Sequence, residues 1–271
     1  MPELPEVETT RRGLEPFLNG QRIAAVRIHD PRLRWPVSPQ VATAPCGQLI
    51  HGVSRRAKYL LIHLERGTII IHLGMSGSLR LASGNESPRT HDHVEFLLDN
   101  GHVLRLHDPR RFGSVHFTED DPLHHRLLSS LGVEPLSDAF TAPLLKSKAG
   151  SRKVAVKNLI MDAKIVVGVG NIYASESLFL AGIHPSRPAG RIALQRYEGL
   201  VAAIRKVLAK AITQGGTTLR DFVNGVGEPG YFAQSLQVYG RAQQPCTICG
   251  SPISSRVIAQ RNTFFCAKCQ R

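Results

Sequence analysis

The sequence has no run of about 18 consecutive apolar residues, which excludes a helix that crosses a bilayer. Its N-terminus also lacks the basic and then apolar layout of a secretory signal peptide. It contains no internal repeats and no low-complexity tract. We therefore expect a cytoplasmic globular protein, and its 271 residues suggest two domains, or one domain with an appendage.

Acidic residues are few relative to basic ones. The chain has 21 Asp and Glu against 34 Lys and Arg, a formal net charge of +13. Such an excess favours a polyanionic partner, and nucleic acid is the commonest candidate. An acidic membrane surface is a second candidate, although no basic amphipathic helix supports it, and charge alone also fits a merely basic protein.

Cysteine is scarce as well, and the number of five is odd, which argues against a disulfide framework. Four of the five form the pattern Cys246-x2-Cys249 and Cys266-x2-Cys269 near the C-terminus. Two such pairs supply four thiolates and complete a closed tetrahedral site, so we expect one structural zinc ion, with iron as the weaker alternative. Zinc here replaces a core that so short a segment cannot build. Cys46 receives no function.

The residues between the two cysteine pairs read as two strands with a turn near Gln260. Because the cysteines anchor one end of this hairpin, Arg261 is expected to point away from the metal. A protruding arginine suits contact with a phosphate, and a solvated surface arginine is the equal alternative.

The rest of the chain changes character near residue 118. Before it, short runs rich in aliphatic and β-branched residues predict a β-sandwich, with the clearest hairpin in HVEFLLDNGHVLRL. After it, EDDPLHHRLLSSLG predicts a helix closed by Gly132, and ALQRYEGLVAAIRKVLAKAITQGG predicts an amphipathic helix stopped by Gly215 and Gly216. The fold class is therefore α+β, with a β-rich N-terminal domain, a helical C-terminal domain and a cysteine-bearing tail.

A glycine-rich turn precedes one of the expected helices. Gly168 and Gly170 flank Val169, and Asn171 can cap the helix that runs to about Gly182. Free N–H groups at such a helix start can bind an anion such as a DNA phosphate. Gly-rich turns before helices are common, and the upstream lysines at 153, 157 and 164 strengthen the interpretation.

The opening MPELPEVE places a proline and two carboxylates at the start of the chain. An ordinary explanation is available, because proline suits the first turn of a helix and acidic residues there interact favourably with the helix dipole. A catalytic reading needs support from the rest of the sequence. We expect this helix to begin near Pro5 and to end or kink near Pro16.

That support comes from a set of motifs in fixed order: MPELPEVETTRRGLEP, RRAKYLL, HLGMSGSLR, HDHVEF, DPRRFG, VVGVGNIYASESLFLAGIHP, QGGTTLRDF, PGYFAQSLQVYGR and the C-terminal cysteine pairs. Over essentially its whole length the chain resembles the bacterial formamidopyrimidine-DNA glycosylase family. The resemblance implies removal of oxidised purines, chiefly 8-oxoguanine and formamidopyrimidines, from duplex DNA, followed by strand cleavage at the abasic site through β- and δ-elimination.

The same resemblance implies three domains. These are a β-sandwich catalytic domain with an N-terminal helix at 1–133, a helix-two-turn-helix DNA-binding domain at 134–236 and a zinc-finger β-hairpin at 237–271. It also implies a bacterial, nucleoid-associated protein, and no feature suggests an oligomer, so we expect a monomer.

The resemblance assigns chemistry to the N-terminus. Pro2, freed by removal of Met1, would attack C1′ of the damaged nucleotide with its secondary amine, which titrates near ~8, below lysine. A retained Met1 would leave Pro2 without a nucleophilic lone pair. Glu3 matches the general acid that protonates the opening sugar, and Glu6 matches a supporting carboxylate.

Further positions match the family's DNA contacts. Lys58 matches a lysine linked to β-elimination, and Arg261 matches an arginine linked to δ-elimination. Contacts with DNA are implied for His91, Arg110, Arg152 and Asn171, and Met75, Arg110 and Phe112 match residues that fill the space left by the everted base. At Arg152 the family often has lysine. The stretch TTLRDFVNGVGEPGYF matches a loop that closes over that base.

Two other classes of protein stay open at this point. An endonuclease VIII-type paralogue shares the fold and the N-terminal proline but prefers oxidised pyrimidines, and MPELPEVE with the Met75–Arg110–Phe112 set favours the purine enzyme. A non-catalytic zinc protein that binds DNA fits the charge and the cysteines. It gives no reason for Pro2, Glu3 and Lys58 to occur together.

Overall fold

The computed structural model describes residues 2–216 and 235–271. The described residues form two compact units, and each is treated by itself. Unit 1 comprises 2–130 with 214–216, and unit 2 comprises 131–213 with 235–271. The boundaries of the three domains expected from the sequence stay a prediction.

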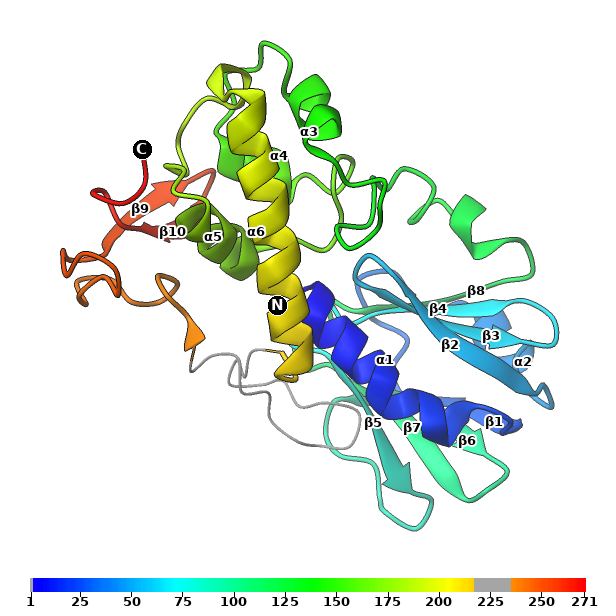
Figure 1. Cartoon of the computed structure of the whole chain (residues 1–271). Coiled ribbons are helices and arrows are strands. Elements are labelled where there is room, and N and C mark those ends of the chain that lie inside the picture. Colours follow the sequence, from blue (N-terminus) through cyan, green and yellow to red (C-terminus); the bar gives the residue numbers. More distant parts are fainter. Residues whose placement is uncertain (1, 217–234) are drawn as a thin grey trace. The chain divides into compact units, whose positions relative to one another are not determined.

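Unit 1 is a β-sandwich of two four-stranded antiparallel sheets (Figure 1). The first sheet has the order β1 (Ile23–Ile28), β6 (Asp92–Leu98), β7 (His102–His107) and β5 (Ser78–Ser83). The second has the order β2 (Ile50–Arg56), β3 (Tyr59–Leu64), β4 (Thr68–His72) and β8 (Ser114–Thr118).

Alternation along the strands decides which side chains form the core of the sandwich. Val94, Phe96 and Leu98 of β6 are buried in the apolar core, as the spacing of two predicts. The intervening Glu95 faces the other side of the same sheet, where its carboxylate contacts His29. The predicted hairpin is confirmed, since β6 pairs with β7 and Gly101 has φ 82° between them.

Helix α1 (Leu4–Leu18) packs against β2, β3 and β5. Its apolar stripe, Leu4, Val7, Leu14 and Leu18, is buried. The helix includes Pro16 and ends two residues later at Leu18, so the expected end near Pro16 is confirmed. Proline at this position removes one hydrogen bond close to a C-terminus, where few bonds remain to be lost. A short helix α2 (Pro39–Thr43) contacts β1 and β8.

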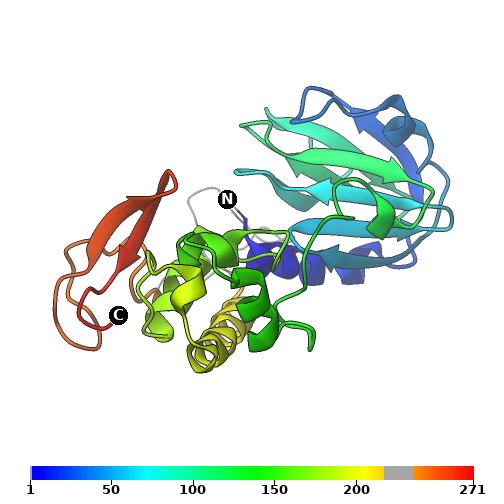
Figure 2. The ribbon, with the colours of Figure 1, turned by 90° about the horizontal axis from the view of Figure 1, so that it is seen from above.

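Unit 2 contains four helices and a β-hairpin. The helices are α3 (Ala142–Ala149), α4 (Val156–Met161), α5 (Asn171–Leu180) and α6 (Leu194–Thr213), with a 3₁₀ turn η2 (Ala189–Arg191). Helix α6 confirms the predicted amphipathic helix and packs against α3 and α5. The hairpin of β9 (Ser254–Ile258) and β10 (Arg261–Phe265) contacts α5, and in Figure 2 its turn lies at the end away from the C-terminus.

The helix expected over residues 119–132 is wrong. Only a 3₁₀ turn η1 (Pro122–His124) forms there, because the Asp121 carboxylate accepts the Leu123 N–H and His125 is already extended. Gly132 instead donates its N–H to the carbonyl of Ala163. Among the described residues, no helix is both long and apolar enough to cross a membrane.

Candidate functional site

The first turn of α1 and the two residues before it hold three of the residues singled out from the sequence. Pro2, Glu3 and Glu6 are all buried, with Glu3 3% and Glu6 1% exposed. Glu6 Oε2 accepts the backbone N–H of Glu3 at 2.8 Å, which is half of a capping box. Glu6 therefore fixes the backbone that carries the other two residues.

Gly216 lies against this turn. A Cβ atom placed on it would come within 3.1 Å of Glu6 Oε1, and its φ of +80° favours glycine. The second glycine of the predicted Gly215-Gly216 stop therefore also makes room for the Glu6 carboxylate.

The turn that carries Lys58 is tied to the same helix. Lys58 follows Ala57 in the tight turn between β2 and β3, and Ala57 has a left-handed φ of 55°. Arg55 donates from Nη1 to the Ala57 carbonyl at 2.8 Å and from Nε to Glu8 Oε2 of α1 at 3.2 Å. Arg11 of α1 adds a bond to the Val53 carbonyl. The structure thus brings Lys58 and the N-terminal helix into one connected element.

His72, at the end of β4, was missed by the sequence reasoning. Its Nδ1 accepts the Gly74 N–H at 3.0 Å, and its ring centroid lies 4.7 Å from that of Tyr59. Burial, and then the nearby charges of Lys58 and Arg34, lower the pKa of His72 to about 4. The imidazole is therefore neutral at physiological pH, with Nε2–H as its donor. Its place at a strand end before a Gly turn, inside HLGMSGSLR, was the available signal.

Asp108 is the second residue that the sequence reasoning missed. Its fully buried carboxylate accepts from Ser76 Oγ at 3.1 Å and from the Gly113 N–H at 2.7 Å. Its backbone N–H donates to the carbonyl of His91, and its carbonyl contacts His93 Nε2. Asp108 thereby joins three short segments of unit 1, which carry Met75, His91, and Arg110 with Phe112. The available signal was its place as the first residue of the motif DPRRFG.

The segments of Met75 and Phe112 touch each other. A Cβ on Gly74 would clash with the backbone of Phe112 and Gly113 at 2.4 Å, so only glycine permits this approach. Met75 is 42% and Phe112 41% exposed, so neither side chain is part of the core. The Arg110 guanidinium lies 5.1 Å from the centre of the Phe112 ring, in the range of a cation–π contact. The trio is thus one exposed, partly apolar cluster.

In unit 2, a buried lysine links three elements. Lys157 of α4, 1% exposed, donates to Asn171 Oδ1 and to Thr263 Oγ1 of β10, the latter at 2.6 Å. Asn171 Nδ2 donates to the carbonyl of Asn262 at 2.9 Å. Asn171 is the first residue of α5 and Gly170 its N-cap, so the expected capping role of Asn171 is wrong. Its Oδ1 instead accepts from Lys157 of α4, and its Nδ2 donates one hydrogen bond to the hairpin.

Arg261 is exposed and is the first residue of β10. The turn before it consists of Ala259 and Gln260, both with positive φ (46° and 60°), as a tight hairpin turn requires. Arg261 therefore projects at the end of the hairpin remote from the cysteines.

Arg152 is exposed in the loop after α3, and its carbonyl accepts the Gly190 N–H at 3.0 Å. This bond places η2 beside it, and together the two segments line a surface pocket formed by Ser151, Arg152, Lys153, Pro188, Gly190 and Arg191. Three cations from two distant parts of the sequence, Arg152 with Lys153 and Arg191, therefore line one pocket.

The four cysteines of the C-terminal motif meet, with all four Sγ atoms within 4.8 Å of one another. Cys246 and Cys269 are 3.9 Å apart at Sγ, and Cys249 and Cys266 are 3.5 Å apart. Zinc–sulfur bonds of about 2.3 Å in a tetrahedron require sulfur separations of about 3.8 Å. The donor set and its spacing fit one zinc ion with no open coordination position.

Comparison with known proteins agrees with this geometry. Family models match in chain order: the formamidopyrimidine-DNA glycosylase N-terminal domain over residues 1–115, the formamidopyrimidine-DNA glycosylase H2TH domain over 131–223, and a zinc finger found in FPG and IleRS over 243–271. A formamidopyrimidine-DNA glycosylase of Alcanivorax borkumensis is 58% identical over 272 residues, with all of both chains covered.

Two Lactococcus lactis Fpg structures are similar over nearly the whole chain. One is a complex with DNA that contains an abasic site, at 33% identity, TM-score 0.92 and 99% coverage of both chains. The other is a wild-type complex with DNA that contains N7-benzyl-Fapy-dG, at 34% identity, TM-score 0.92 and 100% coverage of both chains.

Proposed function

The chain belongs to the formamidopyrimidine-DNA glycosylase family, and from this premise we propose which of its residues carry out each step of the reaction. It is a DNA repair enzyme that excises oxidised purines through an imine at the N-terminal proline and cleaves the abasic strand by β- and δ-elimination. Its zinc finger holds one structural zinc ion on four cysteines.

Pro2 acts as the nucleophile once Met1 has been removed. The neutral secondary amine attacks C1′, the glycosidic bond breaks, and the base leaves with its electron pair and takes up a proton. The amine gives up its proton, and the C1′–O4′ bond then breaks as the ring oxygen is protonated, which leaves an iminium between Pro2 and C1′. This iminium has no N–H proton to lose, so its positive charge persists and acidifies the C2′–H bond. Loss of that proton expels the 3′ phosphate and cuts the strand. The burial of Pro2, directly before the N-cap residue of α1, supports this role.

Glu3 acts as the general acid, and Glu6 holds it in position. Glu3 protonates the sugar ring oxygen as the ring opens, a transfer that requires its carboxyl group to be held within reach. Glu6 supplies that support, because its carboxylate accepts the Glu3 N–H at 2.8 Å. The joint burial of Pro2, Glu3 and Glu6 at the N-terminal end of α1 is the observation that carries the proposal.

Lys58 and His72 bind the phosphates beside the lesion, and Lys58 assists β-elimination. The neutral His72 donates a hydrogen bond from Nε2. Because it carries no positive charge, it does not repel the ammonium group of Lys58, which binds the phosphate. The hydrogen bonds of Arg55 to Glu8 and to the Ala57 carbonyl fix the position of the Lys58 turn relative to the N-terminal helix.

The exposed cluster of Met75, Arg110 and Phe112 fills the space that the everted base vacates. Unstacking a base costs a few kcal/mol, and apolar wedges that enter the stack offset part of that cost. The Arg110 guanidinium is a donor for the orphaned cytosine. Asp108 supports the proposal because it holds the two segments of this cluster together.

The remaining site residues bind the DNA backbone. His91 and Arg110 of unit 1 and Arg152, Asn171 and Arg261 of unit 2 bind phosphates, and Arg261 assists δ-elimination. The loop TTLRDFVNGVGEPGYF, expected to close over the base, lies outside the described residues. We further propose that the enzyme acts as a monomer on oxidised duplex DNA in the bacterial nucleoid.

One assay tests the assignment. The N-terminally processed protein is given duplexes with 8-oxoguanine opposite cytosine, or with dihydrouracil, in the presence of borohydride. We expect preferential cutting of the first duplex and a covalent adduct on the N-terminal peptide. Preference for dihydrouracil would place the chain with the pyrimidine-specific paralogues, and binding with neither cutting nor adduct would refute the catalytic role of Pro2.

A further inference from the structure

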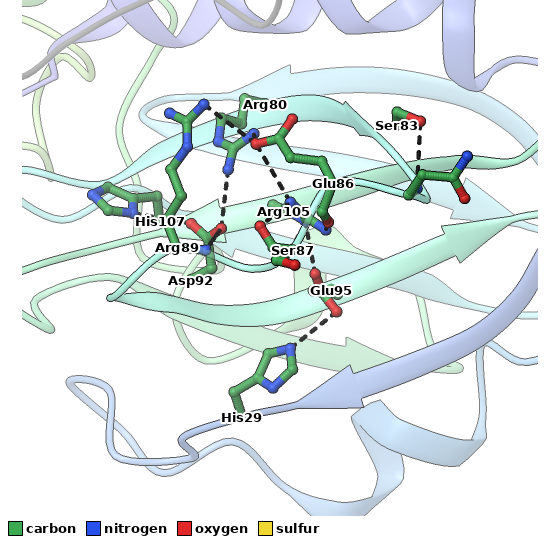
Figure 3. A network of polar contacts seen from close by, with 11 residues as sticks. His29, Arg80, Ser83, Glu86, Ser87, Arg89, Asp92, Glu95, Arg105 and His107 are labelled. Carbon is green, nitrogen blue, oxygen red and sulfur yellow. Dashed lines mark hydrogen bonds and ion pairs between the residues drawn. The ribbon is translucent and has the colours of Figure 1, made fainter.

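The outer face of the β1-β6-β7-β5 sheet carries buried charges rather than a solvated polar surface. Arg80 of β5 and Arg105 of β7 are cross-strand partners, and Arg105 is in turn paired with Glu95 of β6. Arg105 is 2% and Glu95 1% exposed, and Arg80 is 7% exposed. Figure 3 shows this row with the segment that follows β5, residues 84–91, beside it.

Arg80 and Arg105 bind the segment 84–91 through several hydrogen bonds. Arg105 donates to the carbonyls of Glu86 and of Ser87, the second at 3.2 Å, and its Nη1 lies 3.6 Å from Glu86 Oε1. Arg80 reaches Glu86 Oε1 at 3.2 Å and Asp92 Oδ2 at 3.0 Å with its two terminal nitrogens. Glu86 is therefore the only side chain of 84–88 that these two arginines engage among the contacts of the described residues.

The contact of Arg105 with Glu95 is of a different kind. Arg105 Nε lies 2.7 Å from Glu95 Oε1, yet neither atom makes an aligned hydrogen bond. The pair is therefore an electrostatic contact in which the Glu95 carboxylate balances the positive charge of Arg105. The Nη atoms of Arg105 are left to bind the segment 84–91. His29 binds the other oxygen of Glu95 at 2.9 Å.

Stability alone gives a weak reason for such a network. The cost of removing ions from water roughly cancels their attraction, so apolar side chains of similar volume would stabilise the sheet equally well. Guanidinium forks differ from apolar side chains in one respect, because they fix the direction of the backbone carbonyls and carboxylates that they bind. The network therefore suits a segment whose backbone must adopt one position.

The position that is fixed is that of His91. Asp92 Oδ2 accepts the Arg89 N–H at 2.9 Å, and the Asp92 N–H donates to the Arg89 carbonyl at 3.0 Å. These bonds close a turn that holds His91 at φ 76°, while its carbonyl accepts the N–H of Asp108 at 2.9 Å. The His91 side chain is exposed at the end of a segment whose backbone is bound on both sides.

We propose that Glu86, through Arg80 and Arg105, is a positioning residue for DNA binding, and that it acts by setting the place of His91. This inference rests on the proposed contact of His91 with a DNA phosphate. Glu86 itself does not touch the DNA. Its carboxylate keeps residues 86–92 bound to the two arginines. The exposed His91 imidazole is therefore already in place when DNA binds, and no entropy is lost in ordering it.

A double-mutant cycle tests the proposal. Affinity for a duplex with a tetrahydrofuran abasic analogue is measured for Glu86→Gln, for His91→Ala and for both together. We expect Glu86→Gln to weaken binding roughly three- to tenfold, as for residues coupled in one network, and less than about twofold once His91 is absent. The cutting rate of an 8-oxoguanine duplex at saturating protein should stay within about twofold, as for loss of an interaction made equally before and during the reaction.

Glu65→Gln is the matched control. Glu65 is 43% exposed against 39% for Glu86 and also pairs with an arginine, Arg22, at 3.3 Å in the same unit. It should leave affinity unchanged. If Glu86→Gln fails to fold, Arg80→Lys replaces it, because an ammonium keeps the charge but cannot span Glu86 and Asp92.

The outcomes separate the inference from the proposed function. Equal losses with and without His91, or no loss on removing Glu86, overturn the positioning role. An unchanged affinity of His91→Ala overturns both that role and the His91 contact, while cutting of 8-oxoguanine by the unaltered enzyme still upholds the proposed activity.

Discussion

At the scale of single residues, the secondary amine of Pro2 carries most of the proposed chemistry. Glycine at position 2 would supply a primary amine, whose imine can lose its proton and its charge. We expect Pro2→Gly to slow base release and cutting by more than about 100-fold, as for removal of other nucleophiles. Binding of a tetrahydrofuran duplex should stay within about twofold, because no phosphate contact is lost. Single-turnover cutting assays and a binding titration check this, and unimpaired cutting would refute the assigned nucleophile.

His72 makes a prediction about stability. Its pKa is about 4 in the folded protein, against 6.5 for an ordinary histidine. The unfolded chain therefore binds more protons between these values, so stability is complete above pH 6.5 and falls as pH is lowered towards 4. At pH 5 this group alone costs on the order of 2 kcal/mol of unfolding free energy. His72→Asn should lessen the loss between pH 7 and pH 5 in urea titrations, whereas an unaltered loss would contradict it.

Motifs singled out candidate residues, but they did not reveal the contacts that those residues make. Pro2, Glu3 and Lys58 were selected because the motifs around them resemble those of a known family, and their roles stay predictions. His72 and Asp108 were not selected, because their significance lies in the burial of an imidazole and in a carboxylate shared between segments far apart in the chain. Such relations come from tertiary packing, which spacing along one chain does not reveal.

At the scale of elements, the tie between α1 and the β2–β3 turn matters most. Arg55→Met would remove the bonds to Glu8 and to the Ala57 carbonyl while keeping side-chain bulk. We expect strand cutting at a preformed abasic site to slow roughly tenfold, because misplacement by about 1 Å can cost up to 100-fold. Arg12→Met is the control, since Arg12 also pairs with Glu8 but is 59% exposed and makes no bond to β2 among the described contacts. Equal effects of the two substitutions would contradict the tie.

The zinc-finger hairpin is the second element with a testable role. Cys249→Ser should abolish zinc binding, because structural zinc contributes folding free energy directly. Loss of the hairpin would also release Thr263 and Asn262 from Lys157 and Asn171. We expect at least about tenfold weaker DNA binding, a loss of about 1.4 kcal/mol. Metal content and affinity are measured beside Cys46→Ser, an exposed cysteine outside the cluster. Full affinity in a zinc-free protein would refute the structural role.

Elements were predictable where a local pattern agreed with the tertiary environment. Alternation with Asn100-Gly101 predicted the β6–β7 hairpin, and a long apolar stripe predicted α6. Residues 119–132 had helical spacing, but a local Asp121 bond and the tertiary bond of Gly132 directed the backbone elsewhere. The order of strands within each sheet depends on pairings such as β1 with β6, which lie too far apart for any local signal.

At the scale of the whole molecule, the net charge of +13 favours association with DNA. Each cation that neutralises a phosphate releases counterions, so affinity falls with salt by a slope of about 0.9 per contact on logarithmic axes. The pocket of Arg152, Lys153 and Arg191 concentrates three of these charges in unit 2. Arg191 has no counterpart in any motif noted from the sequence, and tertiary bonds such as those of Gly190 to Arg152 and of Ala189 to Val154 place it there.

This pocket yields the last prediction. Arg191→Gln should reduce the salt slope of binding to a tetrahydrofuran duplex by about 1, with a similar change for Arg152→Gln. Lys210→Gln removes the same charge from an exposed position on α6 outside the pocket and should leave the slope unchanged. Titrations at four or more salt concentrations decide the matter. If all three substitutions lower affinity equally at every salt concentration, binding depends on overall charge and the pocket contacts no particular phosphate.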